Sequence, residues 1–119
     1  MKILIIEDDK DTTTLIEASF KKFYKNAELT IVHSGVDAYK ILYSTNRDNQ
    51  FDYIIIDMRL PDENGAEIIK LIKIFFSSKI IVYTAYKDYK DRCKYHYFFE
   101  KGSTTVEELI NMILEDSKI

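Results

Sequence analysis

Side chains able to bind a metal ion or to stabilise a charged group follow four short apolar runs of the sequence. They are Glu7 and Asp8 after residues 3–6, Asp57 after residues 53–56, Thr84 after residues 80–83, and Lys101 just beyond residues 97–99. Carboxylates that lie close together repel one another, and Mg²⁺ relieves this repulsion because it prefers oxygen ligands. A carboxylate nucleophile, Mg²⁺, a lysine and a hydroxyl together suffice for phosphoryl transfer, which depends on positioning and charge neutralisation.

The apolar runs have the length and composition of strands buried on both faces of a parallel sheet. Amphipathic patterns predict a helix after the first, second, third and fifth runs, whereas residues 86–94 have room for a short helix at most. The five expected strands are residues 3–6, 29–33, 53–56, 80–83 and 97–99. The expected helix caps are Ser34, Asn64, and a capping box of Thr104 with Glu107.

The alternation of strands and helices predicts an α/β fold, in which a five-stranded parallel sheet lies between two helical layers. Right-handed crossovers favour the doubly wound, flavodoxin-like strand order 2-1-3-4-5, here with a shortened or remodelled fourth helix. Ligands of such sheets bind outside the carboxyl ends of the strands, so the polar side chains described above are expected to converge there. One domain, residues 1–119, is expected to hold the whole arrangement.

The composition narrows the classes of function. The 119 residues are 46% hydrophobic and 31% charged, which suits a globular domain and not a disordered chain. The net charge of −3 argues against a protein that coats nucleic acid. No uncharged apolar run approaches the ~20 residues of a membrane span. Because Cys93 is the single cysteine, an internal disulfide is excluded, and a cytoplasmic location is expected.

The sequence resembles the response-regulator receiver domains of two-component signalling, of the single-domain type. Each motif is weak by itself, but the four together, in the family's order and at strand ends, are specific and cover most of the chain. The motifs are Ile-Leu-Ile-Ile-Glu-Asp at residues 3–8, Ile-Ile-Ile-Asp-Met-Arg-Leu-Pro-Asp at residues 54–62, Tyr-Thr-Ala at residues 83–85, and Phe-Phe-Glu-Lys at residues 98–101.

The resemblance implies a role for each matching residue. Asp57 matches the phosphoryl acceptor and also belongs to the metal site. In that site Asp8 is the direct Mg²⁺ ligand, Glu7 acts through water, and Arg59 offers its backbone carbonyl. Lys101 matches the lysine that contacts the phosphoryl group.

Other positions match the family's switch and the surroundings of the phosphoryl group. Thr84 matches the hydroxyl residue that moves toward this group, and Ala85 matches the small residue that leaves room for it. Phe98 stands at the position of the aromatic switch but has no hydroxyl, and burial in the core is its more ordinary interpretation. The side chains of Arg59 and Tyr86 are expected to flank the phosphoryl group and to slow the attack of water.

Two departures from the family pattern concern the last third of the chain. The stretch between Thr84 and Lys101 is several residues shorter than usual, and this stretch with its near flank holds five of the nine tyrosines. The tyrosine-rich segment either covers the shortened region or binds a partner. Gly102 follows the lysine where the family commonly has proline, so a cis peptide bond is not expected there.

The resemblance implies a phosphoacceptor signalling domain and not an enzyme that acts on a separate substrate. A histidine kinase or a histidine phosphotransfer protein would supply the phosphoryl group. The domain would catalyse the Mg²⁺-dependent transfer to Asp57 and, later, slow autodephosphorylation. As a monomer or weak dimer it would signal through a downstream protein, with no nucleic-acid or membrane partner.

Three alternatives remain open. A receiver-like interaction module would keep the fold and signal without phosphorylation, which the shortened segment favours. An aspartyl-phosphate phosphatase would need a second aspartate where Arg59 stands, and a flavodoxin would need a phosphate-binding loop rich in serine, threonine and glycine after Ile6. The sequence could also be a piece of a longer regulator.

Overall fold

The computed structural model describes residues 1–46, 50–90 and 92–118. Its centre is a sheet of five strands in the order β2-β1-β3-β4-β5, and every neighbouring pair is parallel. The strands are β1 (Lys2–Ile6), β2 (Glu28–Val32), β3 (Tyr53–Ile56), β4 (Lys79–Thr84) and β5 (Tyr97–Glu100). The predicted fold class and strand order are confirmed, and each strand end lies within one residue of its expected position.

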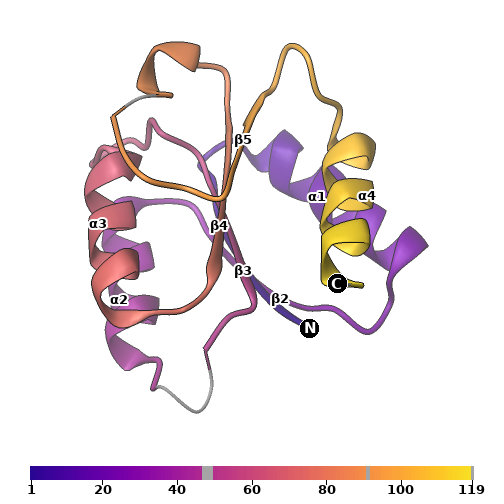
Figure 1. The fold of residues 1–119 in the computed structure, drawn as a ribbon, viewed down its shortest axis with the longest axis horizontal. Coiled ribbons are helices and arrows are strands. Elements are labelled where there is room, and N and C mark those ends of the chain that lie inside the picture. Colours follow the sequence, from indigo (N-terminus) through magenta and orange to yellow (C-terminus); the bar gives the residue numbers. More distant parts are fainter. Residues whose placement is uncertain (47–49, 91, 119) are drawn as a thin grey trace.

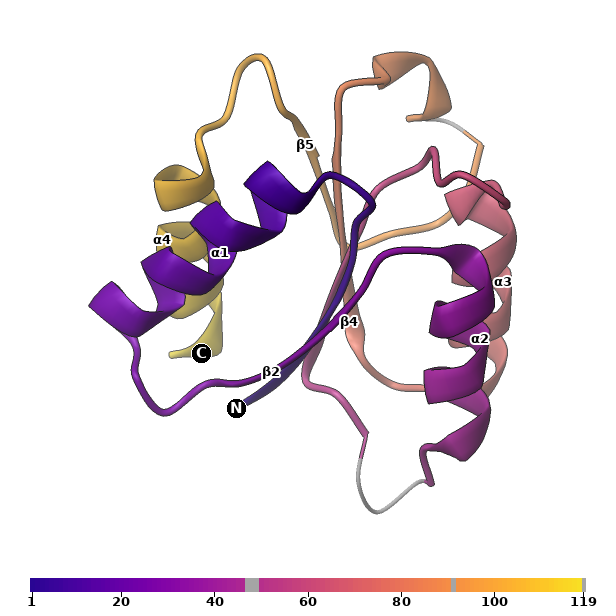
Figure 2. The ribbon, with the colours of Figure 1, turned by 180° about the vertical axis from the view of Figure 1, so that it is seen from behind.

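Helices cover both faces of the sheet, as Figures 1 and 2 show from opposite sides. On one face lie α1 (Lys10–Phe23) and α4 (Val106–Ser117), and on the other lie α2 (Gly35–Ser44) and α3 (Gly65–Phe75). Side chains alternate along a strand. In β1, Ile3 and Ile5 belong to the core under α1 and α4, and Leu4 and Ile6 belong to the core under α2 and α3. Burial of both faces explains why the strands are uninterrupted apolar runs.

Polar side chains fix the start of the first three helices. Asp9 caps α1, Ser34 caps α2 and Asn64 caps α3, each by accepting a hydrogen bond from a backbone N–H of the first turn. The caps at Ser34 and Asn64 are those that the sequence predicted. The Ser34 cap lies two residues after β2, and the Asn64 cap follows the loop of residues 57–63, which begins at the carboxyl edge of the sheet.

The capping box of α4 lies one residue beyond the predicted position. The Thr105 hydroxyl accepts from the Glu108 N–H, and the Glu108 carboxylate accepts from the Thr105 N–H, each at 3.1 Å. The predicted pair, Thr104 with Glu107, is wrong because the Thr104 backbone is engaged before the helix begins. Its carbonyl accepts a hydrogen bond of 2.7 Å from the Tyr83 hydroxyl.

The described part of the connection between β4 and β5 contains one 3₁₀ turn, η2 (Lys87–Tyr89), where an α-helix would complete the alternation. It lies above the carboxyl edge of the sheet in Figure 1. The expected shortening of the fourth helix is therefore confirmed. The two strands are joined again before β5 begins, because the His96 N–H donates to the Ile80 carbonyl and the Ile80 N–H donates to His96 Nδ1, both at 2.9 Å.

The pairing of the strands brings the polar strand ends to one edge. Ile6 of β1 lies beside Ile56 of β3, and Ile56 lies beside Val82 of β4. Thr84 of β4 lies beside Glu100 of β5. The residues that follow these positions are therefore neighbours in space although they are far apart in the sequence. Across the described ranges, none of the helices has the length and apolar character that a membrane span requires.

Candidate functional site

The Asp57 carboxylate lies at the centre of the carboxyl edge and is only 5% exposed. The Thr84 hydroxyl donates to its Oδ1 at 2.6 Å, and the Lys101 ammonium donates to its Oδ2 at 3.0 Å. The two donors come from the end of β4 and from the residue after β5. Each carboxylate oxygen therefore has its own donor, which fixes the orientation of the group.

Two more carboxylates surround Asp57. Oxygens of Glu7, Asp8 and Asp57 lie within 4.8 Å of one another. Glu7 is buried and forms an ion pair of 2.5 Å with Lys101. Burial and the charge of Asp57 raise the pKa of Glu7 to about 8. Partial burial disfavours the charged form of Lys101, but its hydrogen bond with Glu7 and the nearby negative charges raise its pKa overall.

The donor set of this acidic cluster fits a hard divalent cation. It supplies carboxylate oxygens at mutual distances that one ion can bridge, and these are the ligands that Mg²⁺ and related ions prefer. Asp8 is exposed, so a hydrated ion can reach it from solvent. One lysine does not neutralise three carboxylates, and a bound cation would relieve the remaining repulsion.

Asp9, the third acid of the run, has a different task. Its carboxylate accepts hydrogen bonds from the Thr12 hydroxyl at 2.6 Å and from the Asp11 N–H at 3.3 Å. The hydrogen bond from Thr12 lowers the pKa of Asp9. These contacts make Asp9 the N-cap of α1.

The loop after β3 is held close against the acceptor. The Arg59 N–H lies 3.3 Å from Asp57 Oδ1, and the Gly65 N–H donates to the Met58 carbonyl at 2.8 Å. A Cβ at Gly65 would lie 2.5 Å from the Asp57 carbonyl oxygen and 2.9 Å from the Met58 Cα, so only glycine fits there. The sequence analysis did not identify this requirement, because the close approach depends on how the loop folds back onto the strand.

Asp62 joins the same loop to α2. Its carboxylate accepts from the Gly35 N–H at 2.7 Å and from the Val36 N–H at 2.9 Å. These hydrogen bonds lower the pKa of Asp62, as expected for a carboxylate at a helix N-terminus. The acceptor loop is thus anchored to a neighbouring helix, a contact between residues distant in the sequence that the motif alone did not show.

A cavity of about 290 Å³ opens beside the acceptor. The lining contains most of the residues that the sequence analysis singled out. The residues that line the cavity are Asp8, Asp9, Asp57, Arg59, Leu60, Pro61, Ala85, Tyr86 and Lys101. The predicted convergence of these side chains at one edge is therefore observed. Glu7 and Thr84 are buried next to the cavity, through their contacts with Lys101 and Asp57.

Aromatic rings hold the Arg59 side chain at the rim of this cavity. The centre of its guanidinium group lies 4.1 Å from the centre of the Tyr86 ring and 5.9 Å from that of Tyr89. Its Nε also lies 3.5 Å from the Tyr89 hydroxyl, and the Arg92 guanidinium lies 5.1 Å from the Tyr89 ring. Arg59 and Tyr86, which the sequence predicted to flank the phosphoryl group, both line the cavity. The sequence did not reveal the contacts of Tyr89 and Arg92.

Comparison with known proteins gives this site its family. The family model of the response regulator receiver domain matches residues 3–101. The chain belongs to the response-regulator receiver family. Receivers of this family accept a phosphoryl group and lose it by autodephosphorylation, and they act in two-component signalling.

Curated relatives of this receiver are longer regulators. It is 32% identical over 91 residues to the response regulator ArlR of Staphylococcus saprophyticus, with 76% of this chain and 39% of that protein covered. It is 35% identical over 85 residues to the uncharacterized transcriptional regulatory protein YclJ of Bacillus subtilis, with 71% and 35% covered. The chain thus spans less than two fifths of either relative's length.

Solved receivers share the fold. The response regulator TrrA of Thermotoga maritima, solved in complex with Mg²⁺-BeF, is 25% identical with a TM-score of 0.75, and 96% of each chain is covered. The Mn²⁺-bound response regulator Rcp1 is 20% identical with a TM-score of 0.76, and 92% of this receiver and 87% of Rcp1 are covered. Both neighbours hold a divalent metal, which is consistent with the acidic cluster found here.

Phe98 lies apart from the cavity of this receiver. It is partly buried against the core under α2 and α3, and its ring centre lies 5.3 Å from that of Tyr95 in a tilted arrangement. Through β5 it is paired with Val82. The packing agrees with the interpretation of Phe98 as a core residue, and it places the ring beneath the tyrosine-rich segment.

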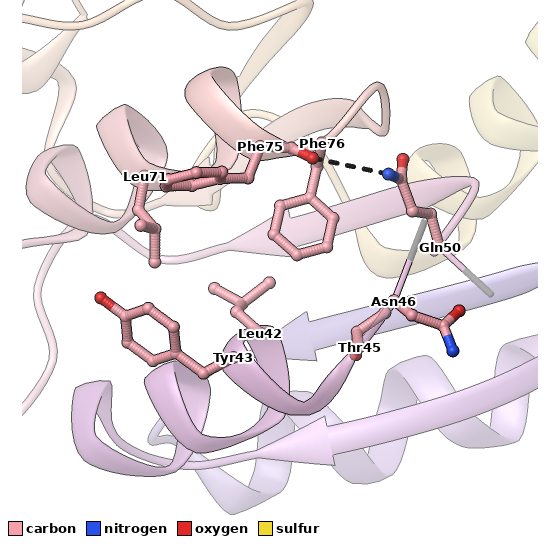
Figure 3. A pocket seen from close by; sticks show the side chains of 8 residues that line it. All are labelled: Leu42, Tyr43, Thr45, Asn46, Gln50, Leu71, Phe75 and Phe76. Carbon is pink, nitrogen blue, oxygen red and sulfur yellow. Dashed lines mark hydrogen bonds between the residues drawn. The ribbon is translucent and has the colours of Figure 1, made fainter. Parts of the chain in front are cut away.

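A second cavity, of about 250 Å³, lies at the opposite end of the α2–α3 layer (Figure 3). Leu42 and Tyr43 of α2 face Leu71 and Phe75 of α3 across it, and the Gln50 amide reaches the Phe75 carbonyl. Among the described residues that line it, none carries a charge. Its described lining combines apolar side chains with uncharged polar ones and offers no carboxylate or cation for phosphoryl chemistry, so the site at the carboxyl edge is the functional candidate.

Proposed function

We propose that this receiver accepts a phosphoryl group from a phosphohistidine onto Asp57. The observation that carries the proposal is the arrangement of donors on the acceptor, with the Thr84 hydroxyl on one carboxylate oxygen and the Lys101 ammonium on the other. The same two donors would stabilise charge on the phosphoryl oxygens once Thr84 and Lys101 turn toward them from the carboxylate.

The transfer needs no proton from the receiver. A carboxylate oxygen of Asp57 attacks phosphorus, the P–N bond of the phosphohistidine breaks, and the imidazole of the donor leaves with the electron pair. Lys101 and Thr84 stabilise the negative charge of the phosphoryl group in the transition state. In phosphoryl transfer, positioning and electrostatics supply most of the catalysis. In the later hydrolysis water attacks phosphorus, the P–O bond to Asp57 breaks, and inorganic phosphate leaves.

Glu7, Asp8, Asp57 and the backbone carbonyl of Arg59 are the groups that would hold Mg²⁺ in this proposal. When bound, Mg²⁺ withdraws charge from the phosphoryl oxygens. The first three offer oxygens close enough to share one ion. Lys101 keeps its ion pair with Glu7 and thereby limits the repulsion inside the cluster.

Arg59 and Tyr86 are expected to prolong the life of the acyl phosphate. Their stacked side chains line the cavity where water must approach phosphorus. Replacement of both by asparagine should open this approach and shorten the phosphoryl lifetime about tenfold, a modest share of what a positioned group contributes. The lifetime is measured as loss of the phosphoryl mass after removal of the phosphodonor, and an unchanged lifetime in the double variant would end this idea.

Partners follow from the same proposal. A histidine kinase or a histidine phosphotransfer protein presents the phosphohistidine, and a downstream protein reads the phosphorylated surface, with Thr84 and Phe98 in the switch. The receiver would act in the cytoplasm as a monomer or weak dimer, without nucleic acid as a ligand. The alternative, an interaction module that needs no phosphate, is favoured by one observation, the 3₁₀ turn in place of the fourth helix.

Intact mass spectrometry distinguishes the two functions. The receiver is incubated with Mg²⁺ and acetyl phosphate, and separately with a phosphorylated histidine phosphotransfer protein, beside Asp57→Ala. One phosphoryl mass on the wild type, and none on Asp57→Ala, is the expected result. If neither donor gives an adduct and Mg²⁺ also fails to bind, the interaction module is the correct function.

A further inference from the structure

In the part of the chain that the structure describes, the Arg59 guanidinium is a cation beside the acidic cluster that forms no ion pair with it. It lies at the rim of a cavity lined by Asp8, Asp9 and Asp57. Among the described residues, however, no ion pair links it to a carboxylate, and its contacts are with the rings of Tyr86 and Tyr89. Arginine stacks well on aromatic rings and equally binds phosphate through its planar fork of donors.

Lys101, in contrast, is already paired with two carboxylates of the site. Lys101 already contacts Glu7 at 2.5 Å and Asp57 at 3.0 Å. A phosphoryl group on Asp57 would add about −1.5 to −2 charges to this cluster. Arg59 lines the same cavity as Asp57, its guanidinium forms no ion pair with a carboxylate among the described residues, and its backbone N–H lies 3.3 Å from the acceptor.

The two tyrosines differ in their relation to the cavity. Tyr86 lines it, so Arg59 can turn toward Asp57 and still remain over this ring. Tyr89 belongs to η2 and is not part of the cavity wall. Its ring lies farther from the Arg59 guanidinium than that of Tyr86, at 5.9 Å against 4.1 Å, and its hydroxyl lies 3.5 Å from Arg59 Nε. A move toward the phosphoryl group would thus keep one contact and give up the other.

We propose that Arg59 is a phosphoryl ligand held in reserve by Tyr89, so that phosphorylation of Asp57 withdraws the guanidinium from η2 and breaks its contacts with the Tyr89 ring and hydroxyl. The inference rests on the proposed phosphorylation of Asp57. In this way phosphorylation of Asp57 would change the contacts of the tyrosine-rich segment through Arg59, independently of any movement of Thr84. Arg59 binds the phosphoryl group and Tyr89 is a positioning residue that acts through Arg59.

A double-mutant cycle with beryllofluoride, a phosphoryl mimic, tests the proposal. The ¹⁹F signal of bound beryllofluoride is titrated in the presence of Mg²⁺ for the wild type, Arg59→Gln, Tyr89→Leu and the double variant. If Tyr89 restrains Arg59, Tyr89→Leu binds about two- to fivefold more tightly than the wild type, the equivalent of one exposed cation–π contact. Arg59→Gln binds more weakly, and the added Tyr89→Leu change then has no effect.

Arg92→Gln is the matched control. Arg92 stacks on the same Tyr89 ring, at 5.1 Å, but does not line the cavity, so its loss should leave the affinity within twofold of the wild type. Tyr89→Phe keeps the ring and loses only the hydroxyl contact. It should shift the affinity in the same direction as Tyr89→Leu by a smaller factor, which protects the test if the leucine variant folds poorly.

The outcomes separate the two proposals. Weaker binding in Tyr89→Leu, or an equal effect of Tyr89→Leu with and without Arg59, would overturn the reserve-ligand inference while leaving the acceptor function intact. Absence of any bound beryllofluoride signal in the wild type would contradict the acceptor function itself. A second measurement uses 3-fluorotyrosine, since the Tyr89 resonance should move on binding in the wild type and stay in place in Arg59→Gln.

Discussion

Both edges of the sheet place a lysine beside buried acid, one carboxylate at the amino edge (Asp116) and two at the carboxyl edge (Glu7 and Asp57), and they use it for different purposes. At the amino edge, Asp116 of α4 accepts hydrogen bonds of 2.5 Å from the hydroxyls of Tyr53 and Tyr97 and one of 2.8 Å from Lys79. Asp116 is 8% exposed, close to the value of Asp57 at the carboxyl edge. Asp57 and Asp116 are therefore buried to a similar extent, and each accepts hydrogen bonds from a lysine and from at least one hydroxyl group.

Charge balance is the difference between them. The hydrogen bonds from Lys79, Tyr53 and Tyr97 lower the pKa of Asp116 to about 2, so one carboxylate faces one lysine and the group is complete. At the carboxyl edge, one lysine faces three carboxylates and a cavity adjoins them. Buried charge without a partner is costly. An excess of it beside a cavity indicates a site that a further ion or group completes.

The largest expected effect is on the amino edge. Asp116→Ala leaves two tyrosine hydroxyls without their acceptor, which should lower the free energy of unfolding by about 3 kcal/mol. Urea unfolding at pH 7 measures it, with Glu115→Ala as the control, since Glu115 is exposed and forms a surface ion pair with Lys118. Phosphorylation of the folded variant should be unchanged, and a loss of phosphorylation would contradict the separation of the two edges.

The contribution of Asp116 to the free energy of unfolding should also depend on pH in the acidic range. The pKa of Asp116 is about 2 in the folded protein and 3.8 is its ordinary value, so the unfolded chain binds the proton more readily. Its contribution to stability is therefore complete above pH 3.8 and is lost as the pH falls toward 2. Asp116→Asn should flatten the unfolding free energy over this interval, and a slope equal to that of the wild type would contradict the assignment.

Lysine replacements should sharpen the contrast between the edges. Lys101→Met removes the cation from Asp57 and should slow phosphorylation by acetyl phosphate about 100-fold, the usual cost of one preorganised electrostatic donor. Lys79→Met removes the corresponding cation at the amino edge and should leave the phosphorylation rate within twofold of the wild type. Initial rates of mass gain measure both, and equal losses in the two variants would show that charge alone, and not its position, matters.

A smaller effect is expected from the backbone under the acceptor. Gly65→Ala forces a Cβ against the Asp57 carbonyl, and the resulting shift should cost about 1–3 kcal/mol of stability and slow phosphorylation. Gly102→Ala is the matched control, because the nearest atom to its added Cβ is a Glu100 side-chain oxygen at 3.8 Å. The two alanine variants are compared by urea unfolding and by mass gain, and equal behaviour would exclude a special role for Gly65.

The sequence predicted the parts of this molecule that follow from strand ends. Asp57, Thr84 and Lys101 could be placed together because parallel strands finish at one edge, whatever the details of the loops. The capping box was misplaced by one residue because two Thr-x-x-Glu patterns overlap. The choice between them depends on the distant hydroxyl of Tyr83.

Contacts between side chains of distant segments could not be predicted from the sequence. The Asp116 cluster joins the starts of three strands and a helix. The helical period places Asp116 on the apolar face of α4 with Leu109 and Ile113, but it does not reveal the tyrosine and lysine partners that the strands supply. Tyr89 and Arg92 likewise needed the path of the shortened connection to bring them to Arg59. Packing and side-chain orientation decide such contacts, and neither can be derived from the spacing of residue types along the sequence.

The shortened connection also limits how this protein can change during evolution. Residues 85–96 link two neighbouring parallel strands, and about a dozen residues is the least that such a crossover requires. Insertions between β4 and β5 can therefore be accommodated, whereas deletions would pull β5 out of register and carry Lys101 away from Asp57. The segment is free to lengthen but has almost no room to contract.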